Sequence, residues 1–182
     1  ARTRTAYERI ISDFEKGKTQ ILIGTQMLSK GLDFGNVSVV GILSADSLMN
    51  FPDFRAHERA YQLMVQVSGR AGRRDKRGTV ILQTTQPEHP LIRMVQHFAY
   101  KEMVSLQLSE RSMFRYPPYY RLIVLILRSR NAEALQEMSA LYAEKLRARL
   151  GERVLGPVTP PITRVQTLHI KKIILKIEIS AG

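Results

Sequence analysis

The sequence predicts an α/β fold, in which a partial lobe with a mostly parallel sheet precedes a small α+β domain. Up to Gln86, short β-rich apolar runs alternate with amphipathic helical patterns. This order implies right-handed crossovers between parallel strands. Pro87 and Pro90 then interrupt the pattern, and helix, strand, helix and strand follow. We therefore expect two domains, residues 1–86 and residues 87–182, the second one truncated at its end.

The first half opens with an amphipathic helix and a buried strand. Apolar residues recur at three- and four-residue spacing from Thr5 to Phe14, which predicts a helix, and Gly17 is expected to end it. The run Gln20 to Gly24, QILIG, is typical of a buried parallel strand. It leads directly into Thr25, which is thus expected at the carboxyl end of a strand.

Two further strands and a helix complete this half. Val37 to Ala45 predicts a second buried strand, with Asp46 just beyond its end. A proline at the first helical position and an acid in the first turn favour a helix that begins at Pro52 and Asp53. Thr79 to Thr84 then predicts a third strand.

The second half has a different order of elements. We expect a helix at Leu91–Leu108, a strand at Arg121–Leu127, a helix at Ala132–Leu150, a turn at Gly156-Pro157 and a last strand at His169–Ile179. The prolines of Tyr116-Pro117-Pro118-Tyr119-Tyr120 impose an extended linker. Its tyrosines either stack on nucleic-acid bases or, as is more common, pack the linker onto a domain.

Composition narrows the class of protein. The chain has 182 residues, 44% of them hydrophobic, and 28 basic against 16 acidic residues give a net charge of +12. A strongly basic chain indicates a polyanionic partner. With no cysteine it has neither a disulfide framework nor a thiolate zinc site, and its four histidines lack metal-ligand spacing. Without an apolar run of roughly 18 residues or a signal-peptide pattern, we expect a cytoplasmic protein and no membrane partner.

Residues Gln66 to Arg73, QVSGRAGR, form the most informative stretch. Arg70 and Arg73 stand three apart among small residues that cannot cover their side chains. Each guanidinium can bind two phosphate oxygens at once, so the pair indicates polyphosphate recognition. A solvated basic helix end is the alternative for so short a pattern.

A second polar stretch, GTQMLSKGLDF at Gly24 to Phe34, follows the first predicted strand. Ligands of open α/β sheets bind beyond the carboxyl ends of strands, which places Thr25 and Gln26 where a phosphate could be held. Helix capping is the alternative role for Thr25, and a common one.

Both stretches resemble conserved helicase motifs. QxxGRxGR resembles motif VI of superfamily 2 helicases, which closes the ATP site from the second RecA-like lobe, and GTQMLSKGLDF resembles motif V. The resemblance implies that Arg70 and Arg73 reach the γ-phosphate and that Gln66 helps to hold them. It also places Gly31, Asp33 and Gly69 near ATP, and Thr25, Gln26 and Lys30 on the DNA.

The surrounding sequence is more specific. MNFPDFRAHERAYQLMVQVSGRAGR, QTTQPEHP, ERSMFRYPPYYRL and VLGPVTPPITRV closely resemble, in this order, the primosomal protein N′ family of bacterial replication-restart helicases. The resemblance implies a 3′ to 5′ DNA helicase of the nucleoid that uses ATP and Mg²⁺ and assembles the primosome at stalled forks. It also implies forked and single-stranded DNA, single-strand-binding protein and other primosome proteins as partners.

Some family features differ or are absent. Ser68 stands where the family usually has alanine, and the loop and strand that carry the candidate DNA contacts Arg164, Lys171 and Lys172 are poorer in arginine and aromatics than is usual. No G-x-x-x-x-G-K-[ST] phosphate loop, acidic metal-binding box or cysteine-rich zinc insertion occurs. Because the chain opens at Ala1 directly in a helical pattern, we expect it to be a piece of a longer protein, the same helicase with its remaining N-terminal parts. Because the phosphate loop and the magnesium site belong to those parts, we expect the chain to have no activity alone.

Two other interpretations stay open. The chain could be a non-enzymatic nucleic-acid-binding or protein-docking module, in which the α+β half is a platform. It could also be the second lobe of an RNA helicase or of a chromatin translocase, since motifs V and VI occur in many such motors.

Overall fold

The computed structural model describes residues 4–25, 37–69, 71 and 78–179. The chain divides into two compact units, Ala1–Gln107 and Leu108–Gly182. This division falls within one helix, later than the boundary after Gln86 that the sequence predicts. The difference arises because the helices that follow Gln86 contribute Leu91, Ile92 and Met103 to the core of the first unit.

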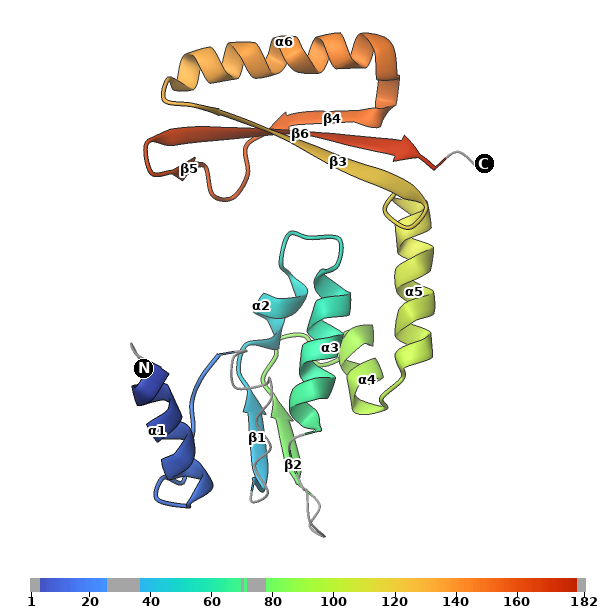
Figure 1. Cartoon of the computed structure of the whole chain (residues 1–182). Coiled ribbons are helices and arrows are strands. Elements are labelled where there is room, and N and C mark those ends of the chain that lie inside the picture. The colour runs from blue at the N-terminus through green and yellow to red at the C-terminus, as the bar shows by residue number, and fades with distance from the viewer. Residues whose placement is uncertain (1–3, 26–36, 70, 72–77, 180–182) are drawn as a thin grey trace. The chain divides into compact units, whose positions relative to one another are not determined.

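The first unit contains a parallel sheet, as the sequence predicts for this half, but its described residues form two strands and not the three that were expected. Its elements are α1 (Arg4–Glu15), β1 (Val39–Ile42), α2 (Ala45–Met49), α3 (Ala56–Ser68), β2 (Thr79–Leu82), α4 (Pro90–Gln96) and the start of α5 (Tyr100–Met113). Strands β1 and β2 pair in register from Val39 and Thr79 to Ile42 and Leu82. Figure 1 shows α3 beside both strands, as expected of a crossover helix.

The core of this unit lies around α3. Ala60, Tyr61 and Met64 are buried at helical spacing, and they belong to one cluster with Met49 of α2 and Val95 of α4. Burial of these apolar side chains holds the helices against one another, at about 25 cal/mol for each Å² of apolar surface removed from water.

The strand predicted at Gln20 to Gly24 is wrong, because these residues have no regular secondary structure. Ile21 and Ile23 are 78% and 84% exposed. A run of β-branched residues becomes a strand only where another strand supplies hydrogen bonds and a surface to pack on. In the described part of this unit, the sheet consists of β1 and β2 alone.

Two predicted helices differ in their bounds. The helix expected to begin at Pro52 begins at Ala56, after a turn. The single helix expected at Leu91–Leu108 is two helices, α4 and α5. They are separated at Phe98, whose φ of 52° is left-handed and incompatible with a continuous helix.

The second unit is the predicted α+β domain, with an antiparallel sheet. Its strands β3 (Tyr120–Ser129), β4 (Val154–Val158) and β6 (Leu168–Glu178) lie in the order β3-β6-β4, and the short β5 (Arg164–Val165) also pairs with β6. Helix α6 (Ala132–Leu150) has the bounds that the sequence predicts and is followed by the 3-10 turn η2 (Gly151–Arg153). Asn131 caps α6 by accepting hydrogen bonds from Glu133 N and Ala134 N.

Helix α6 covers one face of this sheet (Figure 1). Ala143 of α6 packs with Val154, Ile173 and Leu175. The turn expected at Gly156-Pro157 lies instead within β4, where the pairing shifts between Leu155 and Val158. Gly156 is required there, since its φ is 98° and a Cβ would lie 2.8 Å from Lys172 O.

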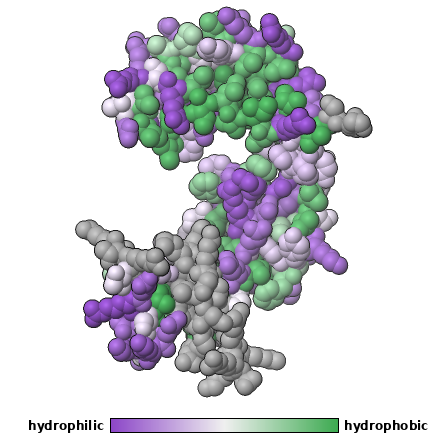
Figure 2. Space-filling model, viewed as in Figure 1, coloured by the Kyte–Doolittle hydropathy of each residue, from purple (hydrophilic) through white to green (hydrophobic). Residues whose placement is uncertain are grey.

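The edge strand β3 exposes four consecutive apolar side chains, Ile123, Val124, Leu125 and Ile126. Met138, Leu141 and Tyr142 of α6 are also exposed. Figure 2 shows hydrophobic residues gathered on the visible face of this unit.

Candidate functional site

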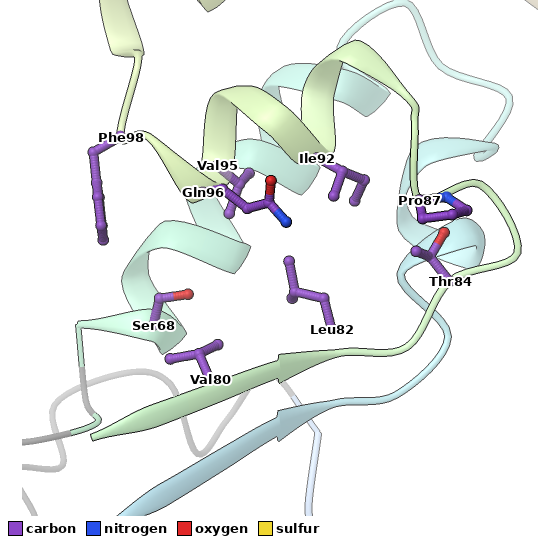
Figure 3. A pocket seen from close by; sticks show the side chains of 9 residues that line it. All are labelled: Ser68, Val80, Leu82, Thr84, Pro87, Ile92, Val95, Gln96 and Phe98. Carbon is purple, nitrogen blue, oxygen red and sulfur yellow. The ribbon is translucent and has the colours of Figure 1, made fainter. Parts of the chain in front are cut away.

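The motif VI stretch begins on α3 and ends beyond it. Because α3 connects the parallel strands β1 and β2, it runs back along the sheet, and its C-terminus lies near the amino end of β2. Figure 3 shows Ser68, the last residue of α3, beside Val80 of β2. Gln66 and Gly69 are exposed at this helix end. Arg70 and Arg73 lie outside the described residues.

The small residues Ser68 and Gly69 leave the end of α3 uncovered by large side chains of their own. Gly69 has an ordinary helical φ of −66°, and its N–H donates to Val65 O over 3.0 Å. A Cβ at this position would lie 3.6 Å from its nearest backbone atoms, an ordinary contact. Neither the local backbone nor packing therefore demands glycine here. The Ser68 hydroxyl donates to Met64 O over 2.7 Å, so serine is accommodated within its own helix.

The residues predicted to contact DNA from motif V are only partly described. Thr25 is exposed and lies outside regular secondary structure. Gln26 and Lys30, with the predicted nucleotide contacts Gly31 and Asp33, lie outside the described residues.

The Asp46 side chain joins the segment after β1 to the segment after β2, at the carboxyl ends of both strands. Asp46, just after β1, accepts hydrogen bonds from Thr84 Oγ1 at 2.6 Å, Thr85 N at 2.9 Å and Thr85 Oγ1 at 3.1 Å. The bond from Thr84 and then that from Thr85 N lower the pKa of Asp46, because they stabilise its charged form. Sequence reasoning gave Asp46 no role. The pattern that could have identified it is an acid after one parallel strand and hydroxyls after the next.

A cavity of about 350 Å³ lies between the end of α3, β2 and α4 (Figure 3). Its lining residues are Ser68, Val80, Leu82, Thr84, Pro87, Ile92, Val95, Gln96 and Phe98. Figure 3 shows Leu82, Ile92 and Val95 around the hollow, with Gln96 between them. None of these nine residues, all of them among the residues that the structure describes, is basic.

The basic candidates of the second unit do not share one face of the sheet. Arg164 of β5 is paired with His169 of β6, and residues paired across antiparallel strands point to the same side. Side chains alternate along a strand, so Arg164 and Lys171 lie on one face and Lys172 on the other. Lys171 Nζ also donates to Thr159 Oγ1 over 2.9 Å. A single nucleic-acid strand on one face would therefore contact only part of the predicted set.

Lys176 attaches the proline-rich linker to β6. Its Nζ donates to Phe114 O over 2.6 Å and lies 3.7 Å from the centre of the Tyr116 ring. Burial, and then the nearby charge of Arg115, lower the pKa of Lys176. Tyr116 thus packs the linker onto the domain, the more common of the two roles considered for these tyrosines.

Two of the four histidines, His57 and His89, have structural side-chain contacts. His89 caps α4 by accepting from Leu91 N at 3.1 Å, and its ring lies 5.3 Å from that of His57. Among the residues that the structure describes, no three His, Asp or Glu side chains gather as metal ligands would. Within the same ranges, no helix has the length and apolar character needed to cross a membrane.

Two family models match the chain, one in each half. Residues 2–75 match the helicase conserved C-terminal domain, and residues 112–182 match the primosomal protein N C-terminal domain. The chain is 39% identical over 173 residues to the replication restart protein PriA of Bacillus subtilis, an alignment that covers 94% of this chain and 22% of that protein.

Other relatives give similar values. PriA of Synechocystis is 38% identical over 178 residues, covering 96% of this chain and 21% of that protein. PriA of Thermotoga maritima is 33% identical over 171 residues, covering 94% of this chain and 23% of the relative. The chain thus spans about a fifth of the length of the curated relatives it matches. The similarity includes both structural units.

Proposed function

The chain belongs to the family of PriA replication restart proteins, in which it corresponds to the C-terminal region, and we propose that it works as part of an ATP-dependent DNA helicase. The observation that carries this proposal is that a match to the helicase C-terminal domain is followed, in the same chain, by a match to the primosomal protein N C-terminal domain. A general helicase lobe would explain the first match but not the second.

In this proposal, Arg70 and Arg73 contact the γ-phosphate of ATP bound by another lobe, and Gln66 helps to position them. ATP with Mg²⁺ would be held mainly by that lobe, because this sequence has no phosphate loop. The chemistry of the stretch fits a phosphate, since arginines follow an exposed helix end of small residues. Charge stabilisation of this kind contributes roughly a thousandfold or more to phosphoryl transfer.

The same unit would also hold DNA. Thr25, Gln26 and Lys30 belong to the part of the sequence between α1 and β1, whereas the motif VI arginines follow α3, which ends near the amino end of β2. Since both stretches belong to the first unit, closure of the arginines on a nucleotide would displace the DNA contacts as well. This coupling would convert hydrolysis into 3′ to 5′ movement.

The partners proposed for the whole protein follow from the family. They are forked and single-stranded DNA, single-strand-binding protein and other primosome proteins, in the cytoplasm of a bacterium. The second unit would supply the docking surface, with Arg164, Lys171 and Lys172 as candidate DNA contacts. The 182-residue chain by itself would hydrolyse no ATP.

The test joins this chain to the upstream lobe and measures DNA-dependent ATP hydrolysis with Arg73→Ala. We expect turnover to fall by roughly a thousandfold while DNA binding persists, because the lost cation acts on the transition state. Arg93→Ala is the matched control, since Arg93 is an exposed arginine of α4 paired with Glu88. Turnover within about tenfold of the unsubstituted enzyme would refute the assignment.

A further inference from the structure

The loop between α2 and α3 presents an exposed aromatic side chain. Its sequence is NFPDFR, from Asn50 to Arg55, and Phe51 is 58% exposed. Figure 1 shows this loop projecting from the first unit at the end where β1 and β2 finish. Ligands of open α/β folds bind at this carboxyl end of the strands. Asp46 accepts its hydrogen bonds from Thr84 and Thr85 at the same end.

Short-range contacts hold the loop in this conformation. Asp53 N donates to Phe51 O over 2.8 Å across Pro52, whose ring fixes φ. The Asp53 carboxylate then accepts from Arg55 N at 2.9 Å and from Arg59 Nη1 at 2.9 Å. The backbone that carries Phe51 is thus braced against the start of α3, so its exposure is a built feature of the loop.

From this geometry we infer that Phe51 is a stacking site for a base of single-stranded nucleic acid, an inference that rests on the proposed DNA-binding function. A phenyl ring offers a flat π-face that any base can stack on, independent of sequence. Beside it, the Arg55 guanidinium lies 5.3 Å from the centre of the Phe54 ring and is a second planar group of the same loop. Guanidinium planes also stack on unpaired bases.

The charges around the loop indicate stacking rather than phosphate binding. Asp53 and Glu58 offset Arg55 and Arg59, so residues 50–59 have no net charge when His57 is neutral. The net charge of +12 on the whole chain attracts the polyanion, and the loop then adds an uncharged contact. Loss of Phe51 should therefore weaken binding without changing its dependence on salt.

The experiment measures binding of fluorescent single-stranded DNA to the 182-residue chain by anisotropy, across a salt series, with an intact strand and an abasic strand of equal length. Phe51→Ala should weaken binding of the intact strand by roughly fivefold or more, the effect of losing one stacked base. It should leave binding of the abasic strand and the salt slope unchanged. Phe51→Trp should retain the affinity of the unsubstituted chain.

Phe98→Ala is the matched control, because Phe98 is 60% exposed but lies at the break between α4 and α5. It should bind both strands normally, and far-UV circular dichroism should show both variants folded. If Phe51→Ala and the unsubstituted chain bound the intact strand equally, the stacking site would be overturned and the proposed DNA-binding function would stand. Equal losses on both strands would also overturn the stacking site. Failure of the unsubstituted chain to bind any single strand would overturn the proposed DNA contact as well.

Discussion

Met64 lies at the centre of the first unit's core, and its replacement by alanine measures how tightly α3 is held. Its side chain is 0% exposed and packs in one cluster with residues of α2, α4 and β1. Alanine and methionine have similar helix propensities, so the effect reports packing rather than helix formation. Truncation of a buried methionine costs about 2 to 5 kcal/mol, the sum of lost transfer energy and the cavity left behind.

That loss is large for a unit of this size, since a small domain has about 5 to 15 kcal/mol of unfolding free energy. With a urea dependence of about 1 to 3 kcal/mol per molar, the unfolding midpoint should fall by roughly 1 M or more. Urea denaturation followed by circular dichroism gives the shift, and hydrogen exchange of α3 peptides assigns it to this unit. Gln66→Ala, two residues away on the exposed face, should change stability by less than about 0.5 kcal/mol. A shift below about 1 kcal/mol for Met64→Ala would refute close packing beneath the motif VI stretch.

Two other predictions concern polar contacts that join distant segments, that of Asp46 in the first unit and that of Lys176 in the second. Asp46→Asn should lower the stability of the first unit at neutral pH, and the difference should shrink as pH falls below about 4. The sign follows from the lowered folded-state pKa of Asp46: its stabilisation is present above the ordinary carboxyl pKa and is lost as the folded carboxylate is protonated. Urea midpoints at pH 7 and pH 3 measure this, and a difference that does not depend on pH would contradict it. Lys176→Met should destabilise the second unit by about 1 kcal/mol, through loss of the bond to Phe114 O and of the contact with the Tyr116 ring. Thermal melts check that value, and faster proteolysis at the linker should accompany it.

Local patterns in the sequence determined a large part of this protein. The periodicity and the capping asparagine of α6 predicted both of its ends, because helix formation depends on residues close in sequence. The alternation of strands and helices in the first half predicted the parallel pairing of β1 and β2, since a helix that runs back along the sheet brings the next strand in parallel to the first. The motif VI stretch also pointed to the helicase family that the comparisons show.

Only the tertiary structure decided which local patterns found a partner. Gln20 to Gly24 has the composition of a strand, but none of the described strands pairs with it. The helical pattern after Leu91 is broken at Phe98 by a backbone angle that periodicity does not encode. Likewise, Lys171 and Lys172 are adjacent in sequence and lie on opposite faces of one strand. The contacts of Asp46 with Thr84 and Thr85 join residues 38 and 39 positions apart. Such pairings depend on how distant segments pack, and that information is absent from any short window of sequence.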